Sequence, residues 1–116
     1  MKLLSKAAIL KATDMTFVDV QVPEWGGVVR VQSMSGTSRD AFESSLTSGS
    51  AKADMTNIRA MYVASCICDE NGELLFTSAD VIELGKKSAK ALDRVFTEAQ
   101  KINMASDDDV EELAKN

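Results

Sequence analysis

The 116-residue sequence contains no histidine and only two cysteines. Histidine is the commonest general base and metal ligand, so its absence excludes Ser-His-Asp and Cys-His nucleophiles and the familiar His-containing zinc sites. Cys66 and Cys68 are too close in sequence for an unstrained disulfide, which favours reduced thiols in a cytosolic protein. They also lack the Cys-x-x-Cys spacing of a redox pair. We therefore expect buried thiols, no metal and no cofactor.

Long apolar runs are missing as well. No stretch approaches the ~18 residues of a membrane span, and Lys6 and Lys11 interrupt the apolar start before it could serve as a signal peptide. The net charge is −5, and residues 105–116 carry five acidic side chains against one lysine, which leaves the rest of the chain nearly neutral. This distribution argues against nucleic acid and membranes as partners.

Two runs of alternating valine and polar residues are present, at 17–22 and 28–33. Val18, Val20 and Val22 share one face of the first run, and Val29 and Val31 share one face of the second. Between them, residues 23–27 combine a proline, which fixes φ, with two glycines, which tolerate positive φ. The pattern predicts a β-hairpin with a loop of about five residues.

Helical periodicity and capping residues predict the other elements. We expect a short amphipathic helix in the first dozen residues, and a helix that is capped by Ser35 or Thr37 and ends at Gly49. Further on, the pattern predicts a central buried helix over 55–67, a turn at 69–73, an extended segment at 74–76, a short helix after a Thr77–Asp80 capping box, and a long helix starting at Ser88. The fold class is thus α+β, mainly helical, with one N-terminal β-hairpin packed with four to five α-helices. We expect one globular domain over 1–104 and an acidic, peripheral or mobile helix within 105–116.

Motifs for catalysis or ion binding are not found. Asp69, Asn71 and Gly72 match part of a calcium loop, but Ile67 and Ser78 then occupy its first and twelfth positions, where carboxylates are required. A tight turn explains these residues better. No phosphate-binding glycine loop occurs, and the aromatic residues are not interleaved with basic ones. The sequence therefore predicts a protein that is not an enzyme.

Residues that could bind a protein partner fall into two groups. Apolar positions on the hairpin loop and the long helix include Trp25, Leu92, Phe96 and Met104. Trp25 either folds back over the hairpin or stays exposed as an anchor. The acidic group is Asp107, Asp108, Asp109, Glu111 and Glu112. These side chains either form a solvated helix start or belong to a docking element, since Val110 and Leu113 give the segment an apolar side.

Several ordered segments resemble a known family. They are residues 22–26, 33–43, 68–76 and 81–96, followed by the acidic tail that begins at Asn103. In this order they are similar to the tail assembly chaperones of long-tailed, siphovirus-type bacteriophages, and the similarity extends over nearly the whole chain from about Lys11. The family provides no catalytic residues and no invariant binding motif to place on this sequence.

The resemblance implies a non-enzymatic chaperone that binds the long, helical tape measure protein and keeps it soluble in the cytoplasm of the infected or lysogenic bacterium. Such proteins are not retained in the mature virion. A longer frameshifted product, which could reach the tail tube protein, is a further expectation. Self-association is expected, because it multiplies weak contacts along an extended client. The alternative is a small acidic inhibitor, similar to an antitoxin, whose tail covers a basic partner surface.

Overall fold

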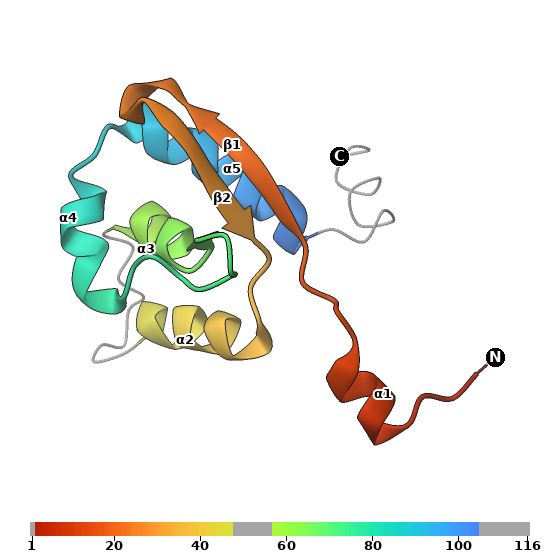
Figure 1. Ribbon diagram of the computed structural model, residues 1–116. Helices are drawn as coiled ribbons and strands as arrows, with labels where there is room; N and C mark the ends of the chain where they lie inside the picture. The colour runs from red at the N-terminus through yellow and green to blue at the C-terminus, as the bar shows by residue number, and fades with distance from the viewer. Residues whose placement is uncertain (1, 48–56, 105–116) are drawn as a thin grey trace, which may run out of the picture.

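The computed structural model describes residues 2–47 and 57–104. Figure 1 shows the elements along the chain. They are α1 (Lys6–Lys11), β1 (Phe17–Val22), a 3-10 turn η1 (Pro23–Trp25), β2 (Gly27–Gln32), α2 (Gly36–Thr47), α3 (Ile58–Ala64), β3 (Ile67–Cys68), a 3-10 turn η2 (Ser78–Asp80), α4 (Val81–Gly85) and α5 (Ala89–Asn103). The predicted class, a mainly helical α+β fold, is confirmed.

The predicted hairpin is present with the expected loop. β1 and β2 are antiparallel, with Val20 opposite Val29 and Val18 opposite Val31. The loop forms one 3-10 turn over Pro23–Trp25 and then reverses at Gly26, whose φ of 75° is a left-handed conformation that suits glycine. Because the side chains of a strand alternate between its two faces, the three valines of β1 turn inward and its polar residues stay at the surface.

The predicted central helix over 55–67 is wrong at its C-terminal end. Within the described residues it spans only Ile58–Ala64, and Ile67–Cys68 forms a third strand, antiparallel to β2. At the break, Ser65 donates a hydrogen bond from its hydroxyl to the Met61 carbonyl (2.9 Å), and the Gln32 amide donates to the Cys66 carbonyl (2.9 Å). A short apolar run suits a buried strand as well as a buried helix, so periodicity could not place the break.

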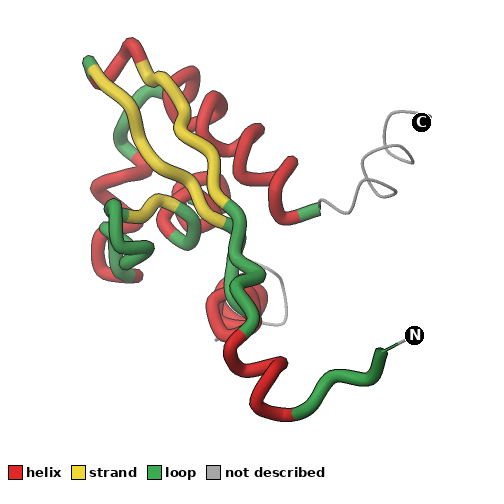
Figure 2. The backbone as a smooth tube through the Cα atoms, turned by 45° about the vertical axis from the view of Figure 1, so that its right-hand side comes forward, coloured by secondary structure: helices red, strands yellow, loops and turns green. Residues whose placement is uncertain are grey.

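The core lies between the sheet and two helices, α3 and α5. Figure 1 shows α5 behind the strands of the hairpin, and the turned view of Figure 2 shows this helix running alongside them. The predicted stripe on α5 is confirmed: Ala91, Val95 and Ala99 have no exposed surface, and Leu92 is also buried. They pack with Val22 and Val31 of the hairpin and with Val63 of α3, which have no exposed surface either. This burial is the main source of stability in a chain of this size.

Polar contacts fix α5 relative to its neighbours. On its outer side, Arg94 pairs with Glu24 of η1 (2.9 Å), which lowers the pKa of that carboxyl. At its end, the Asn103 side-chain oxygen accepts from the Met34 amide (2.6 Å), while its nitrogen donates to the Ala99 carbonyl (2.8 Å) and contacts Cys66 Sγ (3.5 Å). One amide therefore joins the end of α5 to the β2–α2 connection and to the segment before β3.

Capping explains where several helices begin. The predicted Thr77–Asp80 capping box is confirmed, and the Ser88 hydroxyl caps α5 by accepting from the Ala91 amide (2.9 Å). Of the two predicted caps for α2, Ser35 is the one used, since its hydroxyl accepts from the Ser38 amide (3.0 Å). The predictions for Gly49, for residues 55 and 56 and for the helix over 106–113 lie outside the described residues.

Replacing Asn103 tests this junction. Asn103→Ala removes the acceptor of the half-buried Met34 amide, and we expect it to lower the free energy of unfolding by about 1–3 kcal/mol. Gln100→Ala, on the exposed face of the same helix, should change stability by less than about 0.5 kcal/mol. Urea denaturation followed by circular dichroism measures both. Equal stability of the two variants would contradict the role given to Asn103.

Candidate docking surface

An open apolar groove lies beside α3, between α2 and the segment that leads into α4. Its cavity volume is about 750 Å³, within the range of ligand pockets in proteins. The α2 wall includes Phe42, the floor includes Met61 of α3, and the opposite wall is formed by Leu74, Phe76 and the first turn of α4. The other residues lining it are Ser38, Ala41, Ser45, Asn57, Ala64, Ser65, Thr77, Ser78, Val81 and Ile82. The concave shape suits an apolar stripe of another polypeptide.

The wall opposite α2 presents large apolar side chains to solvent. Ile82 is 65% exposed and Leu74 is 40% exposed. Leu75, which follows Leu74 in the chain and is 55% exposed, does not line the groove. Phe76 and Val81 are half-buried and pack against the core, so they connect this surface to the interior. Large exposed apolar side chains that cluster around a concavity are typical of interaction sites, whereas isolated ones are ordinary.

The chain from residue 69 to residue 84 contains five acidic residues and no lysine or arginine: Asp69, Glu70, Glu73, Asp80 and Glu83. None of these five residues lines the groove. Glu83 pairs with Lys86 (3.2 Å), and Glu70 interacts electrostatically with Arg30, whose pKa it helps to raise. Asp69 and Asp80 accept backbone hydrogen bonds within their own turns. Among the described residues the groove lining itself is therefore uncharged.

An N-terminal arm, residues 2–12, forms a second exposed apolar surface. The predicted short helix is present as α1, capped by the Ser5 hydroxyl, but it has no buried residue. Figure 1 shows α1 apart from the rest of the molecule. Its aliphatic side chains are largely exposed: Leu3 90%, Leu4 62%, Ile9 58% and Leu10 75%. The outer face of the hairpin adds Phe17 (60%) and Val28 (59%).

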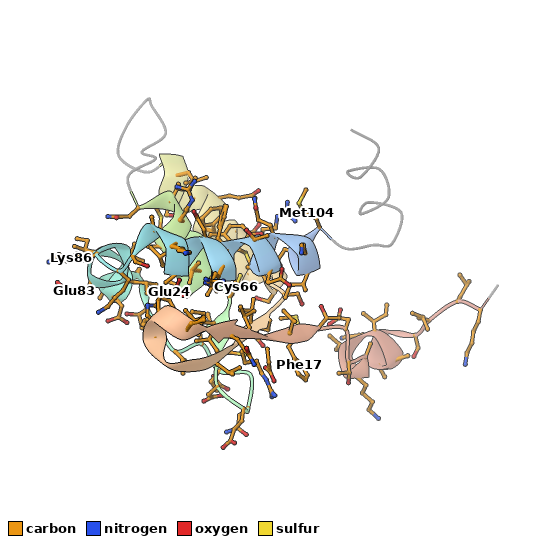
Figure 3. The ribbon with its side chains drawn as sticks, turned by 90° about the horizontal axis from the view of Figure 1, so that it is seen from above. Phe17, Glu24, Cys66, Glu83, Lys86 and Met104 are labelled. Atoms are coloured by element: carbon orange, nitrogen blue, oxygen red, sulfur yellow. The ribbon has the colours of Figure 1, made fainter. Side chains whose placement is uncertain are left out.

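The residues predicted to bind a partner are not gathered in one place. Trp25 is half-buried and packs against the core, which corresponds to the folded-back alternative. Leu92 is a core residue, and Phe96 is half-buried with its ring edge-to-face against Tyr62, at 5.2 Å between centroids. Met104, which Figure 3 labels at the end of α5, is 42% exposed. Asp107, Asp108, Asp109, Glu111 and Glu112 lie outside the described residues.

The apolar positions of α5 were predicted to contact a partner, but in the structure Leu92 is buried and Phe96 is half-buried. No contact role was predicted for residues 74–82, which include one wall of the groove. Leu74, Leu75 and Phe76 are three consecutive apolar residues directly after a turn. A strand with one buried face would alternate apolar and polar residues here, so this run did not indicate which of the three side chains faces solvent.

The cysteine thiols are both free and buried. Burial raises the pKa of the Cys66 thiol from 9.0 to about 11, and desolvation also raises the pKa of Cys68. Over residues 2–47 and 57–104, no group of three or more His, Cys, Asp or Glu side chains is placed to hold a metal ion. None of the helices in that part of the chain is both long and apolar enough to cross a bilayer.

The fold is one that a solved phage tail assembly chaperone shares. That protein is the tail assembly chaperone of bacteriophage HK97, to which this chain is similar with a TM-score of 0.63 and 16% sequence identity, over 87% of this chain and 93% of that chain. At this identity the similarity shows a common fold. No protein family and no curated protein matches the sequence.

The Cys66 thiol predicts how stability changes at alkaline pH. The pKa of this thiol is higher in the folded protein than in the unfolded chain. Its contribution to the free energy of unfolding is therefore complete below pH 9 and is lost as the pH rises towards 11. The free energy of unfolding should therefore fall less steeply over this range in Cys66→Ala than in the unchanged protein. Urea titrations at several pH values measure the slope.

Alkylation gives an independent measurement. In a Cys68→Ala background at pH 8, native Cys66 should react with iodoacetamide at least about 100-fold more slowly than in urea, because the thiolate fraction falls tenfold per pKa unit. Equal rates in the two states would show that burial does not suppress ionisation of this thiol.

Proposed function

We propose that this protein is a non-enzymatic tail assembly chaperone, which binds the tape measure protein of a long-tailed phage and keeps it soluble while the tail is built. The observation that carries the proposal is the fold shared with the bacteriophage HK97 tail assembly chaperone over most of both chains. Fold similarity alone does not define a function, so the surface must also suit the task. The apolar groove beside α3 is the feature of this molecule that does so.

A tape measure protein is a long helical chain, and an amphipathic helix binds partners through an apolar stripe at i, i+3, i+4 and i+7. The groove between α2 and α4 is open to solvent, and its lining combines aliphatic and aromatic side chains with uncharged polar ones. The flexible side chain of Met61 on its floor suits related but different segments, because methionine adapts its shape to its neighbours. Many weak contacts of this kind along one client hold it in solution and still permit release.

The same proposal places the protein in the cytoplasm of the infected or lysogenic bacterium and outside the finished virion. A longer frameshifted product would carry an additional segment toward the tail tube protein. The acidic-inhibitor alternative depends on residues 107–112, which lie outside the described part of the chain, and no observation in the structure favours it.

Co-expression with the tape measure protein of the same phage tests the proposal. We expect the client to move from the insoluble to the soluble fraction and to co-purify with several copies of this chain. Ile82→Glu places a charge on an exposed groove residue and should weaken co-purification about tenfold or more. Val28→Glu is the matched control, since Val28 is similarly exposed but lies on the hairpin, away from the groove.

Two results would contradict the proposal. One is a client that stays equally insoluble with and without this chain. The other is the presence of this chain as a stoichiometric component of purified tails. If Ile82→Glu and Val28→Glu weaken binding equally, the chaperone function would stand, but the client would bind at a surface other than the groove.

A further inference from the structure

The absence of charge from the groove lining, over the part of the chain that the structure describes, restricts what the groove can bind. The lining combines aliphatic, aromatic and methionine side chains with serine, threonine and asparagine. A charged group of a partner placed among them would lose hydration and would meet no opposite charge from these residues, which costs free energy. The contacting face of a partner is therefore uncharged.

Two serines in the lining already have hydrogen-bond partners within this chain. The Ser45 hydroxyl donates to the Phe42 carbonyl (2.7 Å), and the Ser65 hydroxyl donates to the Met61 carbonyl (2.9 Å). Because their donors are satisfied, neither serine requires a hydrogen bond from a partner, and an apolar side chain covers them at little cost. The polar part of the lining thus does not demand a polar partner.

The α2 wall consists of small side chains apart from Phe42. Ser38, Ala41 and Ser45 are spaced by three and four residues, so they share one face of the helix with Phe42, and all four line the groove. Ala41 and Ser45 are exposed. Two packed helices lie about 8–10 Å apart, depending on the side chains between them. A partner helix can therefore approach α2 closely.

The wall opposite α2 has larger side chains. Leu74 and Ile82 are exposed, and Phe76 and Val81 are half-buried. A partner that covers this wall removes apolar surface from water, which is the main favourable contribution to such a contact. The small α2 wall accepts the backbone of a helix, whereas the opposite wall and Met61 on the floor accept its large side chains.

We propose that the client segment bound in the groove is a helix that lies along α2, with small residues against Ser38, Ala41 and Ser45. Its large aliphatic or aromatic residues point between the two walls, and no charged residue belongs to this stripe. The proposal rests on the proposed function, because it states which kind of helix the groove takes from the client. A client helix that is held by charges on its contacting face is the alternative.

Two labelled peptides of about 18 residues, long enough to populate a helix, test the contact without the client. Both carry Lys and Glu on the outer face and Ala at the positions that would face α2. The first has Leu at i, i+3, i+4 and i+7 of the remaining stripe, and in the second two of these Leu are replaced by Lys. Fluorescence anisotropy with the full-length protein measures their affinities. The Leu peptide should bind at least about tenfold more tightly, and its affinity should change less than about twofold between about 0.05 and 0.5 M NaCl.

Ala41→Leu tests the position of the helix. The larger side chain occupies the space against α2, so binding of the Leu peptide and co-purification of the client should both weaken at least about tenfold. Ala41→Ser should retain both. Thr97→Leu is the matched control, because it also places leucine at an exposed helical position, on α5 and outside the groove. Thermal unfolding should be unchanged in all three variants, since both positions are exposed.

Three results would overturn this proposal: equal binding of the two peptides, no binding of the Leu peptide, or equal effects of Ala41→Leu and Thr97→Leu. If the peptides behave as expected but the client stays insoluble, the chaperone function fails and the groove remains a site for uncharged helical stripes. If the client becomes soluble while the Leu peptide does not bind, the chaperone function stands and the client is held by different chemistry.

Discussion

The close approach of α5 to the sheet and to α3 is the constraint on which the rest of the structure depends. It is possible because Ala91 and Ala99 are small and Val95 fits between them, all without exposed surface. Interiors are packed as densely as organic crystals, so a larger residue at either alanine would displace the hairpin. Because α5 occupies the core, its remaining surface is charged, and the apolar surface that stays free is found elsewhere.

Much of the fold could be predicted from local patterns. The hairpin followed from alternation together with a Pro and Gly loop, and α5 followed from its stripe and from Ser88 as a cap. The third strand could not be predicted, because Cys66, Ile67 and Cys68 form an apolar run of only three residues, in which period two and period 3.6 cannot be distinguished. Tertiary structure determines that this segment is a strand. The edge of β2 lies beside it, and pairing with β2 satisfies the backbone hydrogen bonds of both segments.

The candidate docking surface was harder to predict than the fold, because it is assembled from three segments that are distant in sequence. The periodicity of one helix led to the prediction that Leu92 and Phe96 contact a partner. In the structure Leu92 is buried in the core, and the Phe96 ring packs against Tyr62. The residues that do line the groove belong to α2, α3 and the connection into α4, and no local pattern brings these together. By contrast, the apolar side of the arm could be predicted from the sequence, because its periodicity is local. That no other part of the described chain packs against the arm could not be predicted.

Asn103 gives the end of α5 a mechanical property. Its side chain forms hydrogen bonds to the β2–α2 connection and to its own helix, and it contacts the Cys66 thiol before β3. Three contacts therefore hold the last turn of α5 in place. The backbone at Met104 therefore has a fixed position on the body. A force applied at Met104 would act on the sheet and the helices together through Asn103. The last turn of α5 would therefore not unwind before these contacts break.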